Sequence, residues 1–248
     1  MSTRAARNRA SAIEVDDLST WPKPLRAAVE LVAPSYATRR HPSDIWMHDD
    51  HTDLVRRALA GVDVLAYHAT RLLEAEAADI VRTGMRLLDR TLIEEKINGA
   101  RDDGFLTAEE ARMLLDEHAP IDNSAAVRAG QICVRVPRSA FDTDPHGVLP
   151  LMSSWGGEAV YWAHEGTPLG EKLGQIGTPA IVAVVAPSDR AGDHWFPDLP
   201  ALLVAVQLGL EEVASDVHLH DAIPADAIRG IWTPGHPEYD RHGNLPRA

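Results

Sequence analysis

The stretch that decides the fold runs from Val62 to Thr70 and has the sequence VDVLAYHAT. It is short, apolar and partly β-branched, a combination typical of a buried strand. The segment before it, HTDLVRRALAG, has the pattern of a helix that ends at Gly61, where glycine accommodates the left-handed cap position. The sequence therefore predicts a helix that leads directly into a core strand.

Two polar residues, His68 and Thr70, lie where this strand ends. We expect Thr70 to cap the helix that follows, which would place a hydroxyl and unpaired backbone amides beside the imidazole. Such groups can hydrogen-bond a polar ligand. The alternative interpretation is a core histidine satisfied by a backbone carbonyl, with Thr70 serving only as the cap.

Three consecutive helices are predicted over residues 70–117. Apolar residues recur at helical spacing from Leu73 to Gly84, where the first of these helices should end. Two capping boxes follow, each with a threonine three residues before a glutamate: Thr91 with Glu94, and Thr107 with Glu110.

The second half of the chain has a different pattern. QICVRVP alternates between apolar and polar residues, as a half-buried strand does. Further short apolar segments follow, separated by prolines and glycines: EAVYWAH, PAIVAVVA, ALLVAVQL, VASDVHLH and IRGIW. A helix-rich first half followed by a strand-rich second half indicates an α+β fold.

Composition excludes several classes of protein. The 248 residues carry 24 lysines and arginines against 37 aspartates and glutamates, a formal net charge of −13 that argues against a phosphate-backbone binder. A lone cysteine, Cys133, excludes an internal disulfide framework and a cysteine-built zinc site. No apolar run is long enough for a membrane span and the start is not a secretory signal, so we expect a cytoplasmic protein that does not engage a membrane.

The chain divides into three parts. Residues 1–20 are polar and predict a flexible N-terminal arm. Residues 21–235 predict a single domain. Residues 236–248 are polar, interrupted by proline and glycine, and predict a loose C-terminal tail.

A second motif, WGGEAVYW, spans Trp155 to Trp162. Two consecutive glycines permit a sharp turn or a close approach of the backbone to a ligand. If the segment is a strand, Glu158 and Trp162 share one face and Tyr161 lies on the other. The concentration of aromatics fits either a stacking platform for a ligand or a bulged strand with aromatics in the core.

Taken in order, these segments resemble the ADP-ribosyltransferase-like superfamily, which includes poly-ADP-ribose polymerases, DNA-modifying toxins and tRNA 2′-phosphotransferases. The resemblance covers about residues 62–233, with a helical insert at about 91–128. It rests on YHAT, a helix ending at Gly84-Met85, GGEAVYW, LGEKLGQIGTPAIVAVVAP and AIPADAIRGIW. Ala69 and Met85 replace the family's usual glycine and leucine. The resemblance implies an α+β fold with split, mixed or antiparallel β-sheets.

The resemblance also implies roles for particular residues in binding NAD. Tyr67, His68 and Thr70 would belong to the cofactor-binding set, with His68 on the adenosine-side ribose and Thr70 in support. Tyr161 would stack on the nicotinamide, with Trp162 as the other candidate. Breaking the nicotinamide–ribose bond builds an oxocarbenium ion, so catalysis needs a carboxylate beside the ribose, as in glycoside hydrolysis.

The catalytic carboxylate has three candidates. The family's glutamate precedes the turn that corresponds to Ile223-Pro224, which points to Asp216, although aspartate is shorter by one methylene. Glu158 ranks second and Glu212 third. The alternative for Asp216 is a solvated carboxylate at a strand edge.

Two histidine clusters, His48-Asp49-Asp50-His51 and His218-Leu219-His220-Asp221, place nitrogen and oxygen donors close together. A solvated turn is the preferred interpretation of the first cluster, and we assign no metal ligand. Cys133 is expected to be buried and inert. Arg135 and Arg138 could meet a pyrophosphate, or could lie on a solvated strand face.

The leading hypothesis is therefore an NAD-dependent enzyme, a glycosyltransferase that moves ADP-ribose to a macromolecular acceptor or to water. The alternatives are a non-catalytic module that binds a nucleotide or a protein, and a metal-dependent hydrolase built on the histidine clusters. The acidic chain favours a protein or small-molecule acceptor. A nucleic-acid acceptor would require basic residues to gather on the helical insert: Arg86, Arg90, Arg101 and Arg112.

Overall fold

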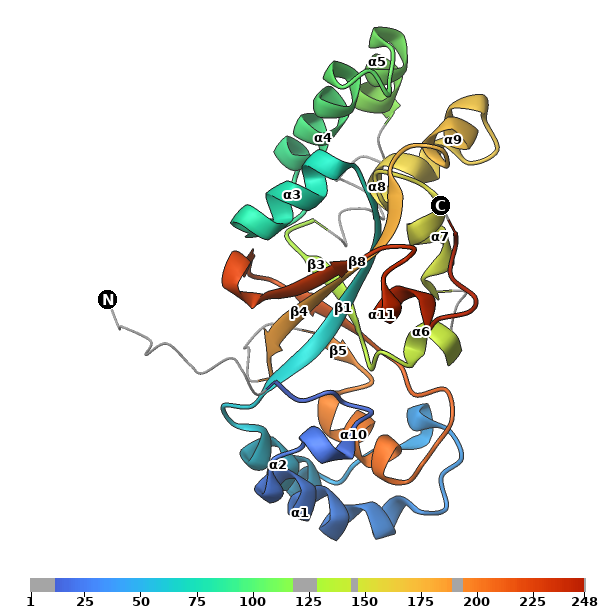
Figure 1. Cartoon of the computed structure of the whole chain (residues 1–248). Coiled ribbons are helices and arrows are strands. Elements are labelled where there is room, and N and C mark those ends of the chain that lie inside the picture. Colours follow the sequence, from blue (N-terminus) through green and yellow to red (C-terminus); the bar gives the residue numbers. More distant parts are fainter. Residues whose placement is uncertain (1–11, 118–128, 144–146, 189–193, 248) are drawn as a thin grey trace, which may run out of the picture.

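We describe a computed structural model of the chain, covering residues 12–117, 129–143, 147–188 and 194–247. Within these ranges the fold is α+β. A six-stranded sheet lies at the centre of an elongated molecule, with the order β5-β6-β3-β1-β4-β8, and a two-stranded ribbon pairs β2 with β7 (Figure 1). The strands are β1 (Asp63–Leu72), β2 (Gly84–Met85), β3 (Ile132–Val136), β4 (Thr178–Pro187), β5 (His194–Phe196), β6 (Ser215–Leu219), β7 (Ile223–Pro224) and β8 (Ile228–Trp232).

The helices surround this sheet (Figure 1). They are α1 (Lys23–Val32), α2 (Asp49–Leu59), α3 (Glu74–Thr83), α4 (Arg90–Asp102), α5 (Ala108–Glu117), α6 (Ala140–Thr143), α7 (Leu149–Ser153), α8 (Glu158–Tyr161), α9 (Pro168–Leu173), α10 (Leu199–Gln207) and α11 (Pro237–Asp240).

Strand β1, which contains the VDVLAYHAT stretch, is an interior strand of the sheet. It pairs with β4 along its whole length, from Asp63 opposite Pro187 to Leu72 opposite Thr178, and with β3 on its other side. All pairs between the named strands are antiparallel, so the larger sheet is antiparallel rather than mixed. The prediction of a core strand is confirmed, and its alternating residues face two different layers.

Two hydrophobic layers cover the sheet. On one face, Val64 and Ala66 belong to a core that includes residues of α1, α2 and α10. On the other face, Tyr67 packs with Phe141 of α6 and Tyr239 of α11. A further cluster at one end of the molecule joins α4 and α5 to the α8–α9 region. Strand β1 ends where this helical part meets the sheet (Figure 1).

The ribbon of β2 and β7 brings together two motifs that are far apart in the sequence. Gly84, which ends α3, lies opposite Pro224, and Met85 lies opposite Ile223. Gly84 has a φ of +89°, and a Cβ there would lie 2.0 Å from the Ile223 carbonyl oxygen. This position therefore requires glycine for both its backbone conformation and the closeness of the two strands.

Two segments that were expected as strands are helical. EAVYWAH forms α8 followed by a 3-10 turn over Trp162–His164, and ALLVAVQL lies in α10. Asp198 caps helix α10, since its side chain accepts a hydrogen bond from the Ala201 amide, and the helix is buried along almost its full length. A short apolar run without polar residues does not reveal its own period, so a buried helix and a buried strand look alike in sequence.

The predicted caps are confirmed in one case and wrong in two. Thr107 and Glu110 form the expected capping box of α5. Thr70 lies within β1 and does not cap α3, which instead has the Glu76 carboxylate bound to the Leu73 amide at 2.8 Å. Helix α4 begins earlier than expected because Asp89 caps it, which places Thr91 inside the helix.

The two terminal segments are more ordered than expected in their described parts. Ile13 is fully buried and bridges Val64 of β1, so residues 12–20 are not a flexible arm. Near the other end, Tyr239, His242 and Leu245 are buried, which corrects the expectation of a loose tail. Residues 1–11 of the predicted arm and 118–128 of the predicted insert lie outside the described ranges.

Candidate functional site

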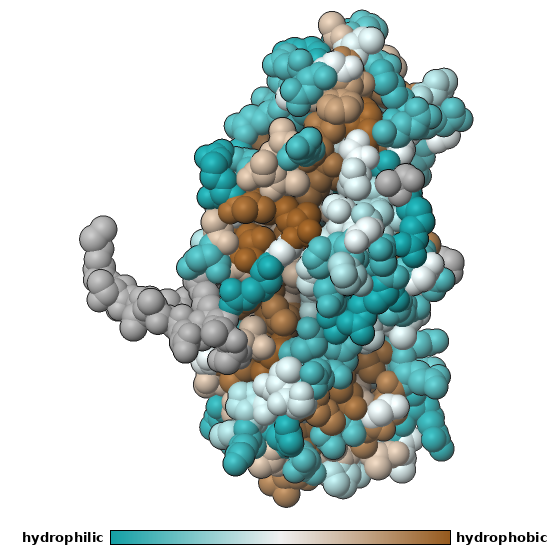
Figure 2. All heavy atoms as spheres, viewed as in Figure 1, coloured by the Kyte–Doolittle hydropathy of each residue, from teal (hydrophilic) through white to brown (hydrophobic). Residues whose placement is uncertain are grey.

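A cavity of about 420 Å³ lies between the end of the sheet and the helical part of the molecule. Figure 2 shows a band of hydrophobic residues between the α3–α4 region and the part around α8, with hydrophilic residues on both sides. Strands β1, β2 and β3 and helices α3, α4 and α8 all contribute to its lining. Its polar and charged lining residues are His68, Thr70, Glu76, Asp79, Arg86, Glu95, Lys96, Asp103, Gln131 and Glu158.

The half-buried imidazole of His68 has a defined hydrogen-bonding role. Its Nδ1 lies 2.7 Å from the Cys133 carbonyl oxygen on β3, and because a carbonyl only accepts, Nδ1 carries the hydrogen. Burial lowers the pKa of His68, and the charge of Lys96 acts in the same direction. The ring is therefore neutral near pH 7, and its Nε2 can accept a hydrogen bond.

Thr70 lies two residues further along β1 and also lines the cavity. Its side chain is largely buried. Among the described residues, its hydroxyl has no hydrogen-bond partner, so it can serve a ligand. His68 and Thr70 project from the same face of the strand, which confirms that they lie together.

Glu158 enters the cavity from a different part of the chain. Gly156 and Gly157 precede it with φ angles of 98° and 70°, a backbone path that favours glycine. A Cβ at Gly156 would lie 2.5 Å from the Cβ of Val160, so the turn and α8 are packed closely. The double glycine therefore works as a sharp turn that directs Glu158 to the cavity lining.

The two aromatic candidates are separated. Trp162 lines the cavity and is 53% exposed. Tyr161 is buried in the hydrophobic cluster of the helical end and does not line it. Because the segment is a helical turn rather than a strand, residues 158 and 162 share a side by helical spacing. Of the two, only Trp162 is among the cavity-lining residues.

A charged cluster in the cavity was not found by sequence reasoning. Lys96 of α4 lies 3.0 Å from Oε1 of Glu76 on α3, and its ammonium lies 5.8 Å from the centre of the Trp155 ring. The other carboxylate oxygen of Glu76 accepts hydrogen bonds from Trp155 Nε1 at 2.9 Å and from the Leu73 amide. The sequence signal for this cluster is weak, since its three side chains come from separate elements.

The basic residues of the insert region do not form a free cationic surface. Arg86 is paired with Glu95, Arg90 with Glu94, Arg101 with Asp102, and Arg112 with both Glu109 and Asp116. Ion pairs of this exposed kind contribute little stability, but they neutralise the charges locally. Each of the four arginines is thus paired with a protein carboxylate, so the basic charge that a nucleic-acid acceptor would require is locally neutralised.

Asp216, the first-ranked carboxylate, lies away from the cavity. It is on β6, where its side chain is 57% exposed and forms a 2.9 Å ion pair with Arg135 of β3. Arg138 pairs with Glu238 at 2.7 Å. Both arginines are therefore paired with carboxylates of the protein. Neither they nor Asp216 line the cavity.

Tyr67 faces the other side of the sheet from His68. Its hydroxyl lies 2.7 and 2.5 Å from the two carboxylate oxygens of Glu14, which is itself buried. Burial raises the pKa of Glu14, and burial together with the nearby carboxyl raises the pKa of Tyr67. Tyr67 thus anchors the N-terminal segment to β1 and does not belong to the cavity.

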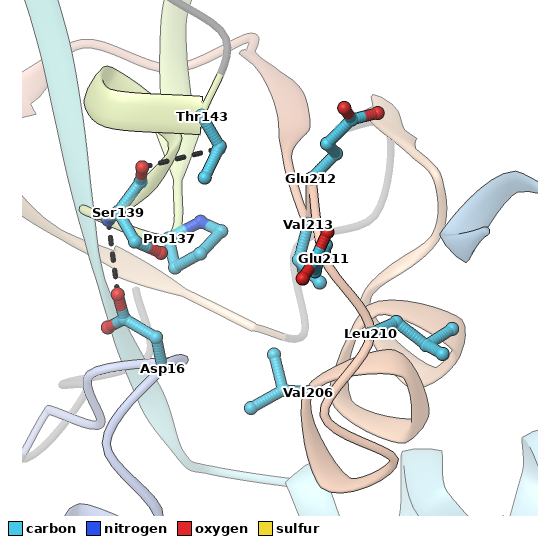
Figure 3. Close-up of a pocket in the computed structure, with 9 residues that line it drawn as sticks. All are labelled: Asp16, Pro137, Ser139, Thr143, Val206, Leu210, Glu211, Glu212 and Val213. Carbon is cyan, nitrogen blue, oxygen red and sulfur yellow. Dashed lines mark hydrogen bonds between the residues drawn. The ribbon is translucent and has the colours of Figure 1, made fainter. Parts of the chain in front are cut away.

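Glu212 lines a different hollow, of about 520 Å³, beside the end of α10. Figure 3 shows it together with Glu211 across from Asp16 and Ser139. The Asp16 carboxylate accepts a hydrogen bond from the Ser139 amide at 3.1 Å. Glu212 also has a positive φ of 56°. The structure therefore does not bring Glu212 together with His68.

Neither histidine cluster is arranged as a metal site in the described part of the chain. His48 and His51 lie at the start of α2 rather than in a loop, and the Tyr36 hydroxyl lies 2.9 Å from Nδ1 of His51. Within the described ranges, no group of three or more histidine, cysteine, aspartate or glutamate side chains is arranged to hold a metal ion. Cys133 is half-buried and lines the cavity, in contrast to the expected buried position.

Comparison with protein-family models, with curated proteins and with solved structures finds no match to this chain. In the described part of the chain, no helix has both the length and the apolar composition that crossing a bilayer requires.

Proposed function

We propose that the cavity binds NAD and that the chain cleaves the nicotinamide–ribose bond, transferring ADP-ribose to a macromolecular acceptor or to water. One observation carries the proposal: His68, Thr70, Glu158 and Trp162, selected from sequence, line a single cavity. They come from two segments about ninety residues apart, β1 and the turn into α8. The proposed site does not include the four other candidates, which do not line the cavity: Tyr67, Tyr161, Asp216 and Glu212.

Cleavage of NAD requires the protein to bind the ribose, to hold the nicotinamide ring and to stabilise the developing positive charge. The cavity has a side chain for each of these roles. The neutral imidazole of His68 accepts a hydrogen bond from a ribose hydroxyl, supported by Thr70. The indole of Trp162 stacks on the nicotinamide ring. The Glu158 carboxylate stabilises the positive charge that develops on the ribose.

The reaction balances without a further reagent. The bond between the ribose anomeric carbon and the nicotinamide nitrogen breaks, and its electron pair neutralises the pyridinium nitrogen. The resulting oxocarbenium ion is attacked by a nucleophile, which loses a proton.

The arrangement of the other motifs supports the finer proposal of an ADP-ribosyltransferase-like, split-sheet fold. Gly84-Met85 and Ile223-Pro224 pair directly in the ribbon, and Gly84 and Met85 also line the cavity. Four of the five segments that carry the resemblance are thus close together: three of them line the cavity, and the segment that contains Ile223-Pro224 pairs with Gly84-Met85.

A non-catalytic nucleotide-binding module is the second candidate. It is favoured by the position of Asp216, the residue that matches the family's catalytic carboxylate, which is ion-paired on β6 outside the cavity. In this case NAD would bind at His68 without turnover.

The two candidates are separated by incubating the full chain with NAD labelled in the adenine, in the presence of cell lysate. The enzyme releases nicotinamide and gives labelled ADP-ribose, either free or attached to an acceptor. His68→Ala should abolish both binding and turnover, whereas His220→Ala, at an exposed position outside the cavity, should leave both unchanged.

If calorimetry detects NAD binding but no nicotinamide is released, the protein is a non-catalytic nucleotide-binding module rather than an enzyme. Absence of NAD binding to the folded protein would reject both candidates.

A further inference from the structure

We propose that Lys96 receives the phosphate of the ligand, so that the cavity selects phosphorylated nucleotides over the corresponding nucleosides. This inference rests on the proposed function, because it assigns a second ligand contact in the same cavity. The residue comes from α4, within the helical insert, and no motif of the family resemblance includes it.

The position of the Lys96 ammonium supports the assignment. The side chain is 23% exposed, lines the cavity and is close enough to His68 for its charge to lower the pKa of the imidazole. It is held between the Glu76 carboxylate and the Trp155 ring. A lysine fixed in this way presents its charge in a defined place and loses little conformational entropy when a ligand binds.

The hydrogen-bonding capacity of Lys96 is not filled within the described part of the chain. An ammonium has three N–H donors, and Glu76 is the one carboxylate with which Lys96 is paired there. Trp155 and the Leu73 amide donate to the other carboxylate oxygen of Glu76, Oε2, and hold the carboxylate in place. Two donors of Lys96 therefore remain for a phosphate oxygen.

The other charged residues of the cavity also favour Lys96 as the phosphate-binding residue. Arg86 is the other cation among the described lining residues; both cations are ion-paired, but the Arg86 side chain is 43% exposed whereas that of Lys96 is 23% exposed. Asp79 is paired with Arg82. Lys96 on α4 and Glu158 on α8 thus provide a cationic and an anionic wall, which fits a ligand with a diphosphate and a positively charged nicotinamide.

The experiment compares the binding of ADP-ribose and adenosine to the full chain by calorimetry, with NAD as the reference ligand. We expect Lys96→Gln to weaken ADP-ribose binding by about tenfold or more and to leave adenosine binding unchanged, because the lost contact is a charge-assisted hydrogen bond. Lys96→Arg should restore most of the affinity for ADP-ribose, since it keeps the charge.

Lys172→Gln is the matched control. It removes the same charge and also breaks one ion pair, with Glu110 at 2.6 Å, but it lies outside the cavity. ADP-ribose binding should be unchanged in this variant. Thermal unfolding of each variant shows whether it is folded before binding is measured.

If Lys96→Gln does not fold, the wild-type protein still tests the proposal. ADP-ribose should then bind about tenfold or more tightly than adenosine, with an affinity that falls as salt is added. Equal affinities for the two ligands, or an ADP-ribose affinity that is the same in Lys96→Gln and wild type, would overturn the role of Lys96 and leave the proposed function standing. Failure of NAD, ADP-ribose and adenosine alike to bind would overturn both.

Discussion

The hydrogen bond between His68 and the Cys133 carbonyl decides what the imidazole can offer a ligand. The bond fixes the hydrogen on Nδ1 and leaves Nε2 as an acceptor. A backbone carbonyl was also the partner expected for a purely structural histidine, so sequence could not separate the two roles. In the structure this bond satisfies one ring nitrogen of a residue that also lines the cavity.

Replacing the candidate carboxylates one at a time should show which of them contributes to catalysis. Glu158→Gln should lower nicotinamide release by about 100-fold or more, because it removes the charge that stabilises the oxocarbenium ion while keeping the shape of the side chain. Asp216→Asn should change it less than about twofold, since Asp216 lies outside the cavity. Steady-state rates with saturating NAD measure both. The reverse order of effects would return Asp216 to the catalytic role.

The buried Glu14 predicts a dependence of stability on pH. Its pKa in the folded protein is raised from the ordinary value of 4.5, chiefly by burial, so the folded state holds a proton that the unfolded state has lost. The contribution of this group to stability is fully present below pH 4.5 and is lost as the pH rises through the raised pKa. The free energy of unfolding should therefore fall over that interval.

Glu14→Gln should remove this component, because an amide does not titrate and still accepts a hydrogen bond from Tyr67. Urea unfolding of both proteins between pH 4 and pH 8 gives the difference curve. Parallel curves for the two proteins would show that Glu14 has an ordinary pKa.

At the scale of elements, the strands and helices with a clear period could be predicted. Strand β1 and helices α2 and α3 follow from their apolar spacing, and β3 from its alternation. The segments that became α8 and α10 could not, because one is short and follows two glycines with positive φ, and the other is apolar on all sides. Tertiary packing decides the structure of such segments.

The residues of the candidate site also fall into those that the sequence could predict and those that it could not. His68, Thr70, Glu158 and Trp162 could be selected from motifs, since each lies in a local pattern. The Lys96–Glu76 pair could not, because it joins two helices whose relative position depends on the whole fold. Asp216 was selected by counting along the chain, which does not give the direction in which a strand residue faces, and it lies on β6 outside the cavity.

The β2–β7 ribbon makes a prediction about one glycine. Gly84→Ala should lower the free energy of unfolding by at least about 3 kcal/mol, because the new Cβ meets the Ile223 carbonyl and the positive φ is strained. Gly99→Ala is the control, since a Cβ there meets nothing within 4 Å inside a helix. That change should raise the free energy of unfolding by about 0.5–1 kcal/mol. Chemical denaturation measures both, and equal effects would mean that Gly84 is not tightly packed.

At the scale of the whole molecule, segments from both ends of the described chain complete the core on either side of β1. Ile13 and Val15 join the layer that includes α1, α2 and α10. Tyr239 and Leu245 join the layer against α6 and α7. The composition of these segments resembles that of loose termini, and their few apolar residues nevertheless find buried positions.

Tyr239 tests the contribution of the C-terminal segment. Its ring is fully buried and its hydroxyl donates to the Pro246 carbonyl at 2.7 Å. Tyr239→Ala should lower the free energy of unfolding by about 3–5 kcal/mol, because it leaves a cavity in the core. Tyr239→Phe, which keeps the ring and loses one hydrogen bond, should cost about 1 kcal/mol. Thermal and urea unfolding compare the two, and a small effect of the alanine variant would show that the segment is not part of the cooperative core.

The brevity of the β2–β7 ribbon has a consequence for the time scale on which the cavity wall opens. Each strand contributes two residues to the ribbon, and one of them, Pro224, has no amide hydrogen to donate. Backbone amides at this edge should therefore exchange with deuterium through local opening, well before those of the ten-residue β1–β4 pairing. Slower exchange at Met85 on addition of a nucleotide would then report occupancy of the cavity, independently of any catalytic turnover.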